Sequence, residues 1–204
     1  MPDIIDWPTA LRPGTVDWPV PVVPQRGGRS AFDGSVQAQL LGAPRWTFEV
    51  STGVMKLDEA PQWEALVQRL RGRVNRVRAW DWRREQPLTK APGALGSPTV
   101  RVDATGNTVQ TQGWTPSITG ILLAGSRFSV NGELKSLSVD ADSDSSGRAT
   151  LSFEPPLRAT APAGGALVLV KPTALFILTT DKPSSAQQGA RMLGMSLAFE
   201  EVFA

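Results

Sequence analysis

The sequence lacks several of the residue types that most often carry out catalysis. The chain of 204 residues contains no histidine, no cysteine and no tyrosine. It therefore lacks the commonest general base, the thiolate nucleophile and the most frequent metal ligand. Without histidine, a Ser–His–Asp site cannot form within the chain. We therefore expect a protein that is not an enzyme and that needs no cofactor.

Arginines form the densest group of charged side chains. They are interleaved with Trp80 and Trp82 and comprise Arg69, Arg71, Arg73, Arg76, Arg78, Arg83 and Arg84. Arginine and tryptophan are both over-represented at protein–protein interfaces. The same pair of residue types also binds single-stranded nucleic acid, through phosphate contacts and base stacking. We favour a structural or interface role over a solvated face, and both over nucleic-acid binding. The formal net charge of only +2 does not by itself imply a nucleic-acid partner.

A short acidic segment is the other candidate site. Asp140, Asp142 and Asp144 have the every-second-residue spacing of a calcium loop. In such a loop the sixth position is glycine and the twelfth is glutamate. Here these positions are Ser145 and Leu151. We therefore expect a solvated turn and no metal site.

The arginines lie in the second half of a predicted strand–helix–strand unit between residues 45 and 84. Its first strand shows the alternation of a half-buried strand, with apolar residues at Trp46, Phe48 and Val50. Its helix has one apolar face, made of Trp63, Leu66, Val67 and Leu70. Asp58 is the expected N-cap, and Gly72 is the expected left-handed residue after the last turn. The second strand is predicted over residues 74–82.

The first 24 residues are rich in proline and repeat one tripeptide, Asp6-Trp7-Pro8 and Asp17-Trp18-Pro19. Proline fixes φ and blocks helix formation, which predicts an extended arm. Trp7 and Trp18 on such an arm need an apolar surface. That surface is either the arm's own domain or a neighbouring subunit, and the sequence leaves both alternatives open.

Short strands and turns follow the loop at residues 85–97. Asn131-Gly132 predicts a type I′ hairpin turn, and Glu154-Pro155-Pro156 predicts the end of a strand. The expected fold is mainly β with one short amphipathic helix. It consists of an extended arm at residues 1–24, a β-sandwich-like module at 25–96 and a small β-barrel or sandwich at 97–182. A closing strand within residues 187–204 is expected to return to the first module.

The order of several short motifs resembles the distal-tail and tail-tip structural proteins of long-tailed bacteriophages. The matching pieces are Arg26-Gly27-Gly28-Arg29-Ser30, Arg45-Trp46, Trp63-Glu64-Ala65-Leu66, Leu70-Arg71-Gly72-Arg73-Val74-Asn75, Pro92-Gly93, Leu123-Ala124-Gly125 and Glu154-Pro155-Pro156-Leu157-Arg158. The resemblance spans residues 25–180 and does not include the N-terminal arm. It implies a virion protein that assembles in the cytoplasm of the bacterial host. Copies would form a ring, expected to be a hexamer, that joins the tail tube to the baseplate hub or fibres.

Protein–protein contact is therefore the leading hypothesis for the function. The candidate interface residues are Trp7, Trp18, Arg71, Arg73, Arg76, Arg78, Trp80 and Trp82. The expected partners are further copies of the chain, the tail tube protein and the baseplate hub or other tail-tip proteins. No apolar run approaches the roughly 18 residues of a transmembrane helix, so no membrane partner is expected. The alternatives are a nucleic-acid-binding module using residues 69–84 and a carbohydrate-binding β module with Trp114 or Trp82 as its stacking platform.

Overall fold

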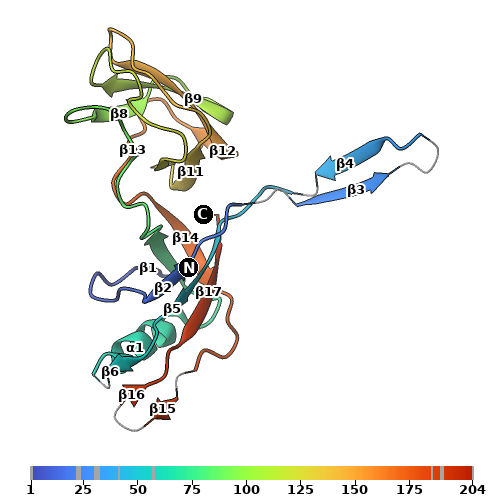
Figure 1. The fold of residues 1–204 in the computed structure, drawn as a ribbon, viewed down its shortest axis with the longest axis vertical. Coiled ribbons are helices and arrows are strands. Elements are labelled where there is room, and N and C mark those ends of the chain that lie inside the picture. The colour runs from blue at the N-terminus through green and yellow to red at the C-terminus, as the bar shows by residue number, and fades with distance from the viewer. Residues whose placement is uncertain are drawn as a thin grey trace.

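The structure is mainly β with a single helix among the residues that it describes, as the sequence predicts. It is a computed structural model that describes residues 2–21, 24–29, 33–40, 42–56, 58–184, 186–188 and 191–203. Two β modules are stacked along the long axis, and a two-stranded hairpin projects to one side between them (Figure 1). The position of the hairpin outside both modules bears on the function of the protein.

The first module is built on a six-stranded sheet. Its strands are β1 (Ile4–Asp6), β2 (Thr15–Asp17), β5 (Thr47–Ser51), β7 (Arg76–Trp80), β14 (Thr173–Leu178) and β17 (Ser196–Glu201). They lie in the order β1-β7-β14-β17-β5-β2, and β1 runs parallel to β7 while the other pairs are antiparallel. Helix α1 (Ala60–Leu70) packs its apolar face on the same hydrophobic core as this sheet.

The proline-rich arm belongs to the first module. Its two short strands, β1 and β2, form the two edges of the first sheet. The side chains of Trp7 and Trp18 are buried in the core of their own chain. Their assignment to an intersubunit interface is therefore wrong. The reason is that each Asp-Trp-Pro tripeptide starts with the last residue of a strand, and the following tryptophan turns into the core.

The boundaries of the predicted modules also need correction. Strand β14, which we expected in the second module, pairs with β7 and β17 of the first. The closing strand is confirmed, because β17 lies between β14 and β5. The second module is thus an insertion between β7 and β14, two strands that are neighbours in one sheet. Trp80 at the end of β7 faces Thr173 at the start of β14.

Helix α1 has the predicted apolar face but a different N-cap. Its N-cap is Glu59 rather than Asp58, and no side chain caps the first turn. The chain leaves the helix through two residues with positive φ, Arg71 at 50° and Gly72 at 64°. Left-handed backbone is costly for arginine and easy for glycine. The predicted left-handed glycine after the last turn is therefore confirmed, and Arg71 is the C-cap before it.

The second module is a nearly closed barrel. Its strands are β8 (Gly96–Val100), β9 (Ala104–Trp114), β10 (Arg127–Val130), β11 (Glu133–Leu137), β12 (Arg148–Ala161) and β13 (Leu167–Val168). The sheet order is β13-β10-β11-β12-β9-β8, so β13 and β8 are its two edges. A single bridge between Thr99 and Ala166 brings these edges together at one point.

Two turn predictions in the second module have different outcomes. The predicted turn at Asn131-Gly132 is confirmed, because both residues have positive φ, at 52° and 74°, and they join β10 to β11. The predicted strand end at Pro155-Pro156 is wrong, because β12 continues to Ala161. Both prolines fall where the pairing of β12 with β9 shifts register, between residues 152 and 157. Proline is tolerated at such irregularities because no ladder hydrogen bond is lost there.

Two small sheets complete the fold. One joins β6 (Met55–Lys56), β15 (Gln187–Gln188) and β16 (Arg191–Met192) at the far end of the first module. The other is the projecting hairpin of β3 (Gln25–Arg29) and β4 (Val36–Leu40). In Figure 1 the hairpin extends far beyond the body of the molecule.

Candidate interaction surfaces

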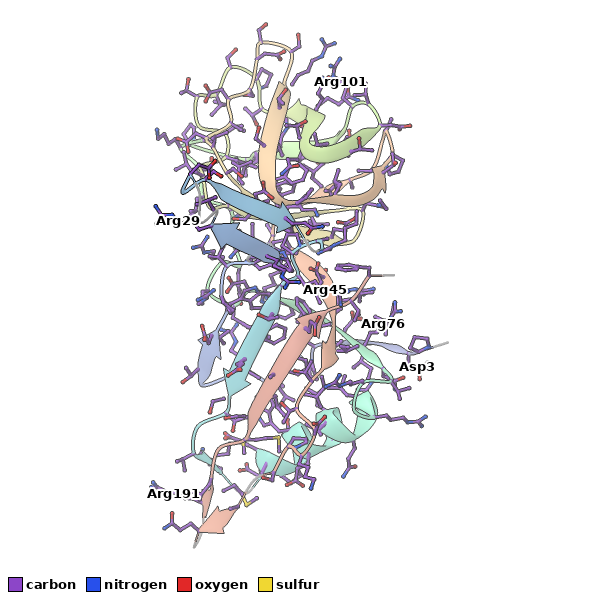
Figure 2. All side chains as sticks on the ribbon, turned by 90° about the vertical axis from the view of Figure 1, so that its right-hand side faces the viewer. Asp3, Arg29, Arg45, Arg76, Arg101 and Arg191 are labelled. Carbon is purple, nitrogen blue, oxygen red and sulfur yellow. The ribbon has the colours of Figure 1, made fainter. Side chains whose placement is uncertain are left out.

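The arginines on β7 lie on the face of the first sheet that points away from the core. Val77 and Ala79 are buried, whereas Arg76 and Arg78 alternate with them on the other face. Arg78 forms an exposed ion pair with Asp6 of β1, with 2.7 Å between Nη1 and Oδ1. Arg76 lies at the edge of the module near Asp3 (Figure 2), whose carbonyl accepts the backbone N–H of Arg76.

Arg71 and Arg73 extend this basic surface around the end of α1. Both side chains are exposed, and Arg73 lies 3.8 Å from the carboxylate of Asp181. We call the set Arg71, Arg73, Arg76 and Arg78 the arginine surface. Four of the eight predicted interface residues thus lie together on the outside of the protein, within reach of another molecule.

The tryptophans of the predicted interface do not lie on that surface as exposed rings. Trp82 packs against the first core, and its ring centroid lies 4.8 Å from that of Trp7. Trp80 is half-buried, and its Nε1 donates a hydrogen bond to Glu85. Trp114, the other candidate stacking platform, is buried in the second core. None of these three rings offers the open face that a base or a sugar requires.

Arg83 and Arg84 point to the junction between the modules. Arg83 binds the buried carboxylate of Asp81 through Nε and Nη2, at 3.0 and 3.1 Å. The hydrogen bond that Arg83 donates to Asp81 raises the pKa of Arg83. Arg84 donates from Nη1 to the carbonyl of Gly125 in the second module, at 2.6 Å. Arg84 therefore connects the two modules, whereas Arg83 binds Asp81 and the carbonyl of Trp18, both of the first module.

A group of buried charges lies at this junction, and the sequence analysis did not identify it. Lys135 of β11 is fully buried, and its Nζ donates to Glu133 Oε2 at 2.7 Å and to the carbonyl of Pro156 at 2.9 Å. Burial lowers the pKa of Lys135. The Glu133 carboxylate also accepts the backbone N–H groups of Arg158 and Ala159. A buried charge is tolerated only with such partners.

Arg158 carries this network into the first module. Its Nη2 lies 3.2 Å from Oε2 of Glu201 on β17, and it also donates to the carbonyl of Pro44. The same carboxylate oxygen of Glu201 accepts the backbone N–H of Trp46 at 3.1 Å. Burial raises the pKa of Glu201 despite these partners.

Trp46 of the first module contacts the second module at this junction. Its Nε1 donates to the carbonyl of Leu134 at 2.8 Å, and Leu134 is packed in the first core. The guanidinium of Arg127 lies over the Trp46 ring at 4.1 Å. Burial lowers the pKa of Arg127 to about 10, and the charge of Arg84 acts in the same direction. Hydrogen bonds, buried ions and apolar contacts therefore connect the two modules.

The acidic segment is a turn whose carboxylates bind the chain itself. Asp140 and Asp142 accept backbone N–H groups of residues 124 and 120, at 2.8 and 2.6 Å. Asp144 accepts the backbone N–H of Arg148 at 2.9 Å, which lowers the pKa of Asp144. Among the described residues, no three acidic side chains gather as a metal site would require.

The projecting hairpin is the last candidate surface. Arg26 and Arg29 of β3 are exposed, and Val36 at the start of β4 is 73% exposed. Within the described part of the chain, no strand pairs with the outer edge of either β3 or β4. The outer edges of both strands are therefore unpaired within the described part of the chain.

No protein family matches the chain, and no curated protein matches it. The described helix is too short and too polar to cross a membrane.

Proposed function

We propose that this protein is a structural subunit of a phage tail tip, of the distal-tail type. Copies of it assemble into a ring, with six as the expected number, that joins the tail tube to the baseplate hub or fibres. The proposal assigns no enzymatic activity and no cofactor to the chain. It places the protein in the virion, after assembly in the cytoplasm of the bacterial host.

The projecting hairpin is the observation that carries this proposal. An isolated two-stranded hairpin is at best marginally stable in water, and β3 and β4 pair only with each other among the described strands. A neighbouring copy that covers the hairpin would bury Val36 and satisfy the open strand edges. A hairpin that contacts a different patch on the next copy makes a heterologous contact, and such contacts generate rings when the rotation closes.

The arginine surface supports a second protein contact. Its four side chains are fixed to a rigid strand and to the end of a helix, and each is at least partly accessible. The tail tube or hub could meet this surface through carboxylates, which pair well with guanidinium groups. The half-buried positions of Trp80 and Trp82 weigh against nucleic-acid stacking. The burial of Trp114 and the partial burial of Trp82 weigh against a sugar platform.

The test is the mass of the assembled full-length chain. Native mass spectrometry and electron microscopy should find a closed ring, and Val36→Asp should release monomers because it places a charge in the proposed contact. Val54→Asp is a matched control, since Val54 is also an exposed valine, at 62%, but lies beside β6. A chain that stays monomeric at high concentration would contradict the proposal, as would a ring that both variants disrupt equally.

A further inference from the structure

An apolar groove lies along the open seam of the second module. It has a volume of about 680 Å³ and is lined by residues 86–87, 89, 93–99 and 166–170. None of these residues carries a charge. A groove of this size and character is suited to an uncharged occupant, because burying an unpaired charge in it would be costly.

The two walls of the groove are the edge strands β8 and β13. They meet at the Thr99–Ala166 bridge, where the N–H of Val100 also donates to the carbonyl of Gly165 at 2.8 Å. Away from this point the strands part, and the groove lies between them. The barrel is therefore open along this seam.

Strand β13 and the residues after it are the better edge for a further strand. Val168 and Val170 are 45% and 52% exposed, although both are apolar. An exposed apolar edge pairs readily with an added strand. On the opposite wall, Pro98 of β8 has no N–H to donate, and proline protects an edge strand from pairing. An incoming strand would therefore pair on the β13 side.

Strand β4 has the composition that the groove requires. It reads Val-Gln-Ala-Gln-Leu, without a charged residue and with apolar residues at alternate positions. Its partner β3 carries Arg26 and Arg29, which suit solvent better than an apolar groove. Since β3 covers one edge of β4 and no described strand covers the other, β4 is the strand of the hairpin that can add to another sheet.

The groove and the hairpin lie on opposite sides of the protein. In Figure 1, β8 and β13 are on the left of the second module, and the hairpin projects to the right at about the height of β13. Copies placed side by side would bring the hairpin of one copy to the groove of the next. This is a head-to-tail contact between two different surfaces, which is the geometry that a closed ring needs.

We propose that β4 of one copy pairs with the free edge of β13 in the groove of the next copy. The added strand closes the seam of the barrel, and its apolar residues cover Val168 and Val170. This inference rests on the proposed function, because it names the contact through which the ring closes.

Cysteine cross-linking tests the contact directly, since the natural chain contains no cysteine. Gln37→Cys or Gln39→Cys is combined with Val168→Cys in the full-length chain, and the protein is oxidised and run on a non-reducing gel. Disulfides form only when the two Cα atoms come within about 7 Å. We expect a ladder of covalent multimers that ends at the size of the ring. The matched control combines the same β4 cysteines with Val54→Cys and should give no ladder.

Further outcomes separate this inference from the proposed function. If the chain forms a closed ring but the Val168 pair gives no ladder, the inference is overturned and the proposed function stands. A ladder with Val54→Cys in place of Val168→Cys has the same meaning. If Val168→Cys instead cross-links to a different protein of the particle, the groove belongs to that partner and the inference also fails. A chain that never forms multimers overturns both proposals.

A point substitution gives an independent test. Val168→Asp puts a charge into the uncharged groove without disturbing the core, because this side chain is already half exposed. We expect the variant to keep its circular dichroism spectrum and to lose the ring. A ring that survives Val168→Asp with unchanged mass overturns the inference.

Discussion

The two β modules differ in where their cores come from. The first core collects residues from the start, the middle and the end of the chain, and its largest side chains are aromatic: Trp7, Trp18, Trp46, Phe48, Trp63, Phe176 and Phe199. The second core comes almost entirely from one continuous stretch, residues 100–169. It is mostly aliphatic, with Trp114, Phe128 and Phe153 as its aromatic members.

The strand pairs of the second module are close in sequence, whereas several pairs of the first module are far apart. The strands of the second module can pair as soon as their own segment is made. The first sheet forms only when β17 has reached β5, about 150 residues away in sequence, as in the pairing of Phe199 with Phe48. Contacts of large sequence separation carry a larger loop-closure cost and form more slowly. We therefore expect the second module to be able to fold by itself and the first to depend on the rest of the chain.

The largest expected effect comes from removing the central ring of the first core. The Phe48 ring stacks on those of Trp18 and Phe199, with centroids 4.5 and 4.7 Å away. Phe48→Ala should cost about 3–5 kcal/mol and shift unfolding of the first module. Phe128→Ala is the matched change in the second core, because that ring is also fully buried.

The positions of the tryptophans allow the effects of these two variants to be measured separately. Six of its seven tryptophans lie in the first module, and Trp114 is the exception. Tryptophan fluorescence during urea unfolding therefore reports mainly on the first module, and far-ultraviolet circular dichroism reports on both. Phe48→Ala should shift the fluorescence transition, and Phe128→Ala mainly the circular dichroism. If both probes shift together in both variants, the modules unfold as one unit and the comparison breaks down.

Local patterns in the sequence predicted the local elements well. The apolar face of α1, the alternation in β5 and the turn at Asn131-Gly132 each depend on residues close in sequence, and each is present. The sheet to which β14 belongs could not be predicted in this way. Its partner β7 is distant in sequence, and its partner β17 follows after a long loop. The alternation of apolar residues alone does not show which sheet a strand joins.

The burial of charged and aromatic side chains was harder to predict, because it depends on segments that are distant in sequence. Trp7 and Trp18 looked available to a neighbour, but strands β5 and β7 bind their arm to the first sheet. Glu133 and Lys135 flank Leu134 in a strand, a pattern that is typical of a solvated face. They are buried because they share a face with their partners Val130 and Phe128 of β10, which belong to the second core. It is Leu134, on the other face of β11, that packs against the first module. The residues of the arginine surface are accessible because they lie at the end of a helix and opposite buried neighbours, and their role as an interface stays a prediction.

The buried ions at the junction should give the next largest effect. Lys135→Met removes the closer of the two cations beside the buried Glu133 carboxylate and leaves only Arg158, at 3.8 Å, as its ion-pair partner. Breaking a buried pair in this way costs about 3 kcal/mol or more. Lys171→Met is the control, because Lys171 pairs with Glu85 at 3.7 Å in a half-exposed position, where a pair contributes about 0–1 kcal/mol. Urea unfolding measures the loss of stability in both variants. Equal losses would show that the buried ion pair at the junction contributes no more than the ion pair at the surface.

The smallest expected effect is a pH dependence of the free energy of unfolding that arises from Glu201 at the junction. Burial raises the pKa of Glu201 above the ordinary glutamate value of about 4.3. Between these two values the folded protein keeps a proton that the unfolded chain has released. Stability is therefore full below the ordinary value and falls as the pH rises through the raised one. Glu201→Gln cannot ionise, so its free energy of unfolding should lack this fall.

The neighbouring Glu200→Gln separates this effect from a general change of charge. Glu200 is more exposed and pairs with Arg45 at 3.1 Å, whereas Glu201 meets Arg158 of the second module. Urea unfolding from about pH 4 upward should give parallel curves for the wild type and Glu200→Gln, and a flatter curve for Glu201→Gln. Three parallel curves would contradict the raised pKa. A flatter curve in the fluorescence transition would show that docking of the second module contributes to the stability of the first.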